Sequence, residues 1–150
     1  MRKINLILIV VLIFNFTCCQ NQGKNKFYKE SEEIYKSAIE IHDEVMPMMS
    51  EIMKLQSALK SKKEGISDDE SLEKINIVLQ KLENAHNSMM HWMRNITPIP
   101  DISDNDSSLS TYPSEDEMLK IQQKSLESIK EVKAAILTSI KEANTLLSAL

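Results

Sequence analysis

The fold is decided between residues 34 and 59, which read IYKSAIEIHDEVMPMMSEIMKLQSAL. Apolar residues recur there in alternating steps of four and three, the spacing that places side chains on one face of an α-helix. This face consists of Ile34, Ala38, Ile41, Val45, Met48, Ile52, Leu55 and Leu59. Such a stripe is typical of a helix that packs in a bundle. The pattern therefore predicts one long helix over residues 27–62.

The same periodicity predicts two further helices. The second spans residues 68–96, and Ser67 and Glu70 form the sequence pattern of a capping box at its start. Its apolar face consists of Leu72, Ile75, Leu79, Leu82, His86, Met89 and Met93. The third helix spans residues 114–149 and also starts with a capping box, formed by Ser114 and Glu117. Its apolar face consists of Leu119, Gln122, Leu126, Ile129, Lys133, Ile136, Ile140, Ala143, Leu147 and Leu150, widened by Val132 and Leu146.

The connections between these helices predict their arrangement. The first two helices are joined by only a few residues, so they are expected to be antiparallel neighbours. Residues 97–113 form a long irregular loop rich in proline, serine and aspartate, which we expect to cross the bundle before the third helix. The sequence thus predicts an all-α bundle of three long helices over residues 27–150, preceded by an N-terminal signal helix. Either three helices complete the core, or two chains share a face.

The first 26 residues are expected to lie outside this bundle. A positively charged start is followed by an apolar run over residues 4–16, which is shorter than the ~20 residues needed to span a membrane. Residues 1–18 resemble a bacterial lipoprotein signal peptide, after which a cysteine carries the lipid. We expect Cys19 to be that cysteine, with Cys18 as the alternative; an ordinary secretory signal or an uncleaved anchor are the other interpretations. Residues 19–26 are expected to form a flexible tether.

The charge of the chain argues against a nucleic-acid partner. The 18 basic and 22 acidic residues give a formal net charge of −4, and loss of Arg2 and Lys3 with the signal peptide would lower it to about −6. Nucleic-acid binding requires a basic patch that neutralises phosphates, and the sequence contains no such stripe. No cysteine follows Cys19, so the sequence offers no pair for a disulfide within the domain.

Three segments carry a resemblance to a known family: HDEVMP at 42–47, EIMKL at 51–55 and AHNSMMHWMR at 85–94. Together with the lipoprotein signal, they resemble small lipoproteins of Bacteroidetes, especially flavobacteria, that are often labelled viral A-type inclusion proteins. That label reflects coiled-coil similarity. The resemblance covers most of the mature chain and implies a helical fold and a lipid anchor in the cell envelope, but no activity. Residues 20–24 lack the acidic residues that follow the cysteine in some exported lipoproteins of these bacteria, which favours an anchor facing the periplasm.

Histidine and methionine are concentrated in two of these segments. Seven of the nine methionines lie between residues 46 and 53 or between residues 89 and 93. Helical spacing places His42, Met46, Met49 and Met53 on one face of the first helix, beside its apolar seam. His86, Met90 and Met93 share a face of the second helix, with Met89 between them, and Trp92 is expected to pack the end of that helix. Antiparallel packing would bring the two sets to one level of the bundle.

These residues admit a packing interpretation and a binding interpretation. Flexible methionine side chains fill irregular cores, and they also form adaptable grooves for apolar partners. A kink at Pro47, which has no backbone N–H to donate, would expose such a groove. Imidazole and thioether groups also suit Cu(I), which makes His42, Met46, His86 and Met90 a candidate copper site. The full candidate ligand or partner face is His42, Met46, Pro47, Met49, Met53, His86, Met89, Met90 and Met93.

The sequence predicts no catalytic residues. The expected function is a non-enzymatic helical interaction module, anchored to the membrane by its lipid, that contacts another envelope protein or a second copy of itself. The alternative is a periplasmic protein that binds copper or a small ligand through the histidine and methionine layer between the first two helices.

Overall fold

The computed structural model describes residues 28–101 and 111–150. Its helices are α1 (Lys29–Val45), the short 3-10 helix η1 (Met46–Met48), α2 (Met49–Lys63), α3 (Asp69–Asn95) and α4 (Glu115–Ala149). The predicted all-α bundle is confirmed, and its three helices begin and end within one or two residues of the predicted bounds. The predicted signal peptide 1–18, the tether 19–26 and both cysteines lie outside the described residues.

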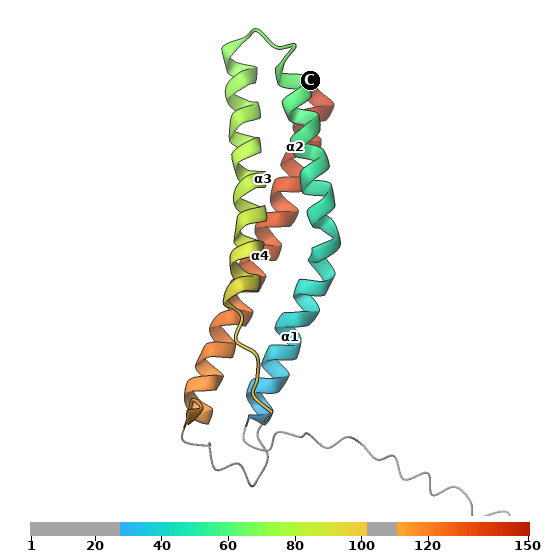
Figure 1. Ribbon diagram of the computed structural model, residues 1–150. Coiled ribbons are helices and arrows are strands. Elements are labelled where there is room, and N and C mark those ends of the chain that lie inside the picture. The colour runs from blue at the N-terminus through green and yellow to red at the C-terminus, as the bar shows by residue number, and fades with distance from the viewer. Residues whose placement is uncertain (1–27, 102–110) are drawn as a thin grey trace, which may run out of the picture.

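α4 is the central helix of the bundle. It packs against α1, α2 and α3, and it runs from the end where α1 begins to the end where α2 is joined to α3 (Figure 1). α4 is therefore parallel to α1 and α2 and antiparallel to α3. α3 ends at the end of the bundle where α4 begins (Figure 1); the prediction that residues 97–113 cross the bundle rests on residues 102–110, which lie outside the described residues. None of the helices in the described part of the chain combines the length and hydropathy of a membrane-spanning segment.

A single main core fills the space between α4 and the other helices. Its buried members are Ala38, Val45, Met49, Ile52, Leu55, Leu59, Ile75, Val78, Leu82, Ala85, Met89, Trp92, Ile129, Val132, Ile136 and Ala143. On α1, α2 and α4, these positions follow the predicted seams with one exception: Met49, predicted beside the seam, is buried, and Met48 of the predicted seam is half-buried. Burial of these apolar side chains supplies the main driving force for assembling the helices.

The buried face of α3 differs from the predicted one. Ile75, Leu82 and Met89 are buried as predicted. Val78, Ala85 and Trp92 are buried as well, whereas His86 is half-buried and Met93 is 39% exposed. Each of these three additional buried residues lies one position before a residue of the predicted seam, so α3 is rotated toward α4. The rotation has a physical reason: α3 packs more extensively against α4 than against α2, and its most apolar surface therefore faces α4.

Pro47 divides the first predicted helix into two. Without a backbone N–H, proline cannot donate the hydrogen bond that would continue the α-helix, and its ring crowds the preceding turn. The chain instead forms the 3-10 turn η1, after which the Met49 N–H donates to the Met46 carbonyl and α2 begins. α1 and α2 consequently form one bent column along α4 (Figure 1).

The start of α3 is capped by Asp68, and the predicted capping box of Ser67 and Glu70 is wrong. The Asp68 side chain accepts a 2.8 Å hydrogen bond from the Ser71 backbone N–H. This bond lowers the pKa of Asp68 below its ordinary value. Glu70 forms an ion pair with Lys74 one turn further along the helix. Aspartate stabilises a helix N-terminus as well as serine does, so capping by Asp68 instead of Ser67 costs the helix no stability.

Part of the predicted irregular loop is packed against the bundle beyond the end of α3. Ile99 contacts a small cluster formed by Tyr28 and Met118. The Gln122 side chain, which is fully buried, donates a 2.9 Å hydrogen bond to the Thr97 carbonyl, and the Tyr28 hydroxyl donates to the Pro113 carbonyl. Burial raises the pKa of the Tyr28 hydroxyl. These contacts join the start of α1, the start of α4 and the segment that follows α3.

The predicted capping box at the start of α4 is confirmed. The Ser114 backbone N–H donates to the Glu117 carboxylate at 2.9 Å, and the Glu117 N–H donates to the Ser114 hydroxyl at 3.3 Å. The hydrogen bonds from Ser114, with the backbone N–H contributing most, lower the pKa of Glu117 below its ordinary value of 4.5. The carboxylate thus stabilises the folded state while it is ionised.

Replacing Glu117 with glutamine should make stability less dependent on pH. Because the folded-state pKa of Glu117 is lowered, its stabilising contribution is present above pH 4.5 and is lost as the pH falls through the folded-state pKa. Wild type should therefore unfold at a higher temperature than Glu117→Gln at pH 7, and the difference should disappear in acid. Thermal unfolding followed by circular dichroism measures this. Glu115→Gln is the control, and an equal effect in that variant would contradict a specific role of the capping box.

Candidate functional site

His42 contacts an aromatic ring. Its imidazole stacks on the indole of Trp92, with ring centroids 5.5 Å apart and an interplanar angle of 25°. Its Nδ1 lies 2.9 Å from a carboxylate oxygen of the neighbouring Asp43. The imidazole is thus held between the face of an indole ring and a carboxylate. The structure thus brings the His42 segment of α1 to the Trp92 segment of α3, as the antiparallel arrangement predicts.

Trp92 joins three helices. It belongs to α3, its ring contacts His42 of α1, and its Nε1–H donates a 3.0 Å hydrogen bond to the Ser125 carbonyl of α4. A buried tryptophan usually satisfies its N–H in this way. The bond to Ser125 fixes the orientation of the indole, and the indole in turn fixes the position of His42.

The fluorescence of Trp92 should report its contact with His42. Trp92 is the one tryptophan of the chain, and the imidazole of His42 stacks on its ring. Replacing His42 with glutamine should therefore change the intensity or wavelength of Trp92 emission at pH 7, because it removes the stacked ring. The change should be absent in His91→Gln, whose histidine is exposed. An emission spectrum of His42→Gln identical to that of wild type would contradict the contact.

The methionines of the candidate face divide into core and surface residues. Met49 and Met89 are buried in the main core. Met46 and Met90 are half-buried, whereas Met53 is 61% exposed and Met93 is 39% exposed. The packing interpretation therefore accounts for the first two residues. The exposed pair is the part of the face that can contact a partner, and Pro47 is also exposed beside it.

A groove between α2 and α3 is lined by two of the nine candidate residues, Met53 and His86. Its volume is about 350 Å³, within the range of small-ligand sites. It is lined by Met53, Gln56, Lys60, Leu79, Glu83, His86 and Asn87. The rotation of α3 toward α4 creates this groove, because it moves Leu79 and His86 from the core to its edge. Its lining combines the apolar side chains of Met53 and Leu79 with an imidazole, one cation, one carboxylate and two amides.

The structure places the two candidate copper-binding histidines in different surroundings. His42 stacks on Trp92, and His86 lines the α2–α3 groove next to Lys60 and Met53. Within residues 28–101 and 111–150, no three histidine, aspartate or glutamate side chains are grouped as a metal site would require. A site made of imidazole and thioether groups alone stays a prediction for His42, Met46, His86 and Met90.

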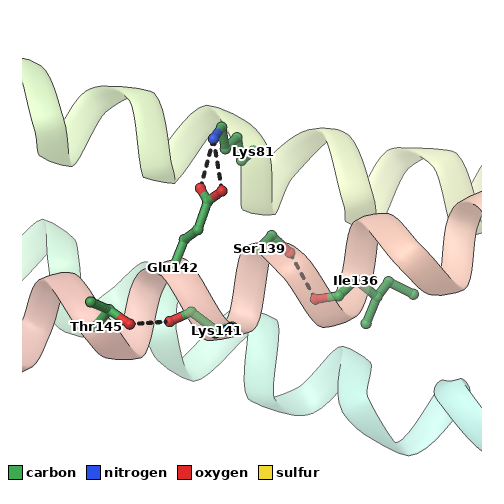
Figure 2. Close-up of polar contacts among 6 residues, drawn as sticks. All are labelled: Lys81, Ile136, Ser139, Lys141, Glu142 and Thr145. Atoms are coloured by element: carbon green, nitrogen blue, oxygen red, sulfur yellow. Dashed lines mark hydrogen bonds and ion pairs between the residues drawn. The ribbon is translucent and has the colours of Figure 1, made fainter.

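A second groove, between α3 and α4, was not predicted. It has a volume of about 580 Å³ and is lined by Lys74, Ile77, Val78, Thr138, Lys141, Glu142, Thr145, Leu146 and Ala149. Figure 2 shows Lys81 of α3 reaching across to Glu142 of α4, with distances of 2.9 and 2.7 Å to the two carboxylate oxygens. One sequence signal pointed to this groove: Ile77 is an apolar residue outside the predicted face of α3, and it is 46% exposed.

Comparisons with known proteins do not assign the chain to a family. The sequence matches no protein-family model, no curated protein and no solved structure. The function is therefore inferred from the fold and from the two grooves.

Proposed function

We propose that this protein is a membrane-tethered lipoprotein of the bacterial cell envelope and that its helical domain is a non-enzymatic interaction module facing the periplasm. The tether is the lipid on Cys19 that the N-terminal sequence predicts. The module contacts its partner, an envelope protein or a second copy of the chain, through the surface formed by α2 and α3 opposite α4. The resemblance to small flavobacterial lipoproteins supports the same proposal.

The exposed methionines carry the proposal. Met53 of α2 is 61% exposed and Met93 of α3 is 39% exposed, although both belong to otherwise amphipathic helices whose outer faces are polar. Methionine is flexible and polarisable, so a surface that contains it adapts to differently shaped apolar partners. Met46, Leu79 and Met90 are half-buried, so part of each side chain is also accessible to a partner.

Lipidation is tested by incorporation of a labelled fatty acid into the full-length chain in a bacterial host. Label should be lost in Cys19→Ala and retained in Cys18→Ala. Loss of the label in Cys18→Ala, together with its retention in Cys19→Ala, would show that Cys18 carries the lipid. Retention in the double variant would contradict a lipid on either cysteine, and absence of label from the wild type would contradict lipidation.

The contact surface is tested by placing a photo-crosslinking amino acid at position 53, 93 or 130 in cells. Lys130 is exposed on α4, so position 130 is the matched control. Positions 53 and 93 should give a discrete adduct of higher mass that mass spectrometry identifies as one partner or as a dimer. Equal crosslinking at position 130, or none at positions 53 and 93, would contradict an interaction surface at the methionines.

Copper binding is the second candidate, because Met53 and His86 line one groove and because soft ligands suit Cu(I). A competition titration against a chromophoric Cu(I) chelator tests it. Binding that weakens in a His42→Ala/His86→Ala variant would support a copper site, whereas equal binding by the variant and the wild type would contradict it.

A further inference from the structure

We propose that the α3–α4 groove binds a single alkyl chain with an anionic head group, such as a free medium-chain fatty acid. The proposal is independent of the interaction surface formed by Met53 and Met93, because it concerns a different pair of helices. It rests on the apolar floor of the groove, on the charge of its rim and on its length.

The floor of the groove is apolar. Ile77 and Val78 line it from α3, and Leu146 and Ala149 line it from α4. Ile77 is 46% exposed and Leu146 is half-buried. An alkyl chain lying on this floor would remove apolar surface from water on both sides, which favours binding by about 25 cal/mol for each Å² buried. The volume of about 580 Å³ is in the range of sites that hold small ligands.

The rim of the groove is locally positive on an acidic protein. Among the residues that line the groove, Lys74 and Lys141 contribute two positive charges and Glu142 contributes one negative charge, which leaves one positive charge. The whole chain has a formal net charge of −4. Glu70 is paired with Lys74 and Glu142 with Lys81. Within residues 28–101 and 111–150, Lys141 has no carboxylate within ion-pair distance, so its ammonium group is available to a ligand carboxylate.

The length of the groove favours an alkyl chain over a partner helix. The Lys81–Glu142 ion pair crosses between α3 and α4 (Figure 2), and the apolar floor on α4 continues from there to Ala149. With a rise of 1.5 Å per residue, this stretch is about 10 Å long. A docked helix would have to bury several turns, whereas a medium-length alkyl chain fits this distance with its head group near Lys141.

Decanoate, below its micelle-forming concentration, is the probe for this site. Isothermal titration calorimetry with the full-length protein should show saturable binding, and decanol should bind more weakly because it lacks the charge. Lys141→Glu should weaken decanoate binding by about tenfold or more, and Ile77→Asp should weaken it similarly by placing a like charge on the floor. Both positions are exposed, so the fold should persist in both variants.

Two controls match these variants. Lys130→Glu makes the same charge change on an exposed position of α4 away from the groove, and Leu137→Asp matches Ile77→Asp as an exposed apolar residue outside it. Both should bind decanoate as wild type does, and methyl resonances of Ile77 and Leu146 should shift on titration. Equal weakening by Lys130→Glu, undiminished binding in Lys141→Glu, or shifts confined to the methyl groups of Met53 and Met93 would overturn the proposal.

Discussion

Replacing Ile136 with alanine should lower the free energy of unfolding by about 2–5 kcal/mol, the usual cost of truncating a large buried aliphatic side chain. Ile136 is fully buried at the middle of α4. Since α4 contacts α1, α2 and α3, a cavity there removes contacts that hold the helices together. A small domain is typically stable by only about 5–15 kcal/mol, so this loss would be a large share of the total. Urea unfolding followed by circular dichroism measures it.

The adjacent residue provides the control. Leu137 is 43% exposed and has almost the same side-chain volume as Ile136. Leu137→Ala should therefore cost about 1 kcal/mol or less. If the two variants lost equal stability, α4 would not present the face of Ile136 to the other helices, and its central position in the fold would be contradicted.

Replacing Trp92 with alanine should lower the free energy of unfolding by about 3–5 kcal/mol. The substitution removes a large side chain that is 5% exposed, its stack with His42 and its hydrogen bond to the Ser125 carbonyl. Trp92→Phe keeps much of the ring packing but loses the hydrogen bond, which leaves a carbonyl without that donor, so it should cost about 1–3 kcal/mol. Thermal and urea unfolding should rank the proteins as wild type, phenylalanine variant and alanine variant.

Met93 supplies the comparison for this series. It follows Trp92 on α3 but is 39% exposed, so Met93→Ala should have a small effect on stability. A cost equal to that of Trp92→Ala would mean that the two residues share the same environment, and the observed rotation of α3 would be wrong. The same variant should reduce photo-crosslinking near position 93 if the methionine surface binds a partner, so stability and binding can be separated.

Much of the helical fold could be predicted because its determinants are local. The spacing of Ala38, Val45, Ile52 and Leu59 defines a helix face without reference to any other part of the chain. Ser114 and Glu117 likewise form their capping box within four residues. The position of Pro47 fixed where the helix would be interrupted, because a missing N–H is a property of that residue alone.

The rotation of α3 could not be predicted from local spacing. Its sequence offers two overlapping apolar faces, one through Val78, Ala85 and Trp92 and one through Leu79, His86 and Met93. Which of them is buried depends on whether α2 or α4 is the main neighbour, and that is a property of the assembled bundle. The partner of His42 depended on this rotation, since it is the rotation that brings Trp92 into the core. The α3–α4 groove was missed for the same reason.

α4 follows α1, α2 and α3 in the chain, so the surface that covers these helices is synthesised after them. The ion pair of Glu44 and Lys133, which links α1 to α4, joins residues 89 positions apart, and most of the core surface of α1 is covered by α4. α1, α2 and α3 emerge first from the ribosome but lack the surface against which they would pack. The α2–α3 hairpin can form early, whereas the core closes only after α4 has been synthesised.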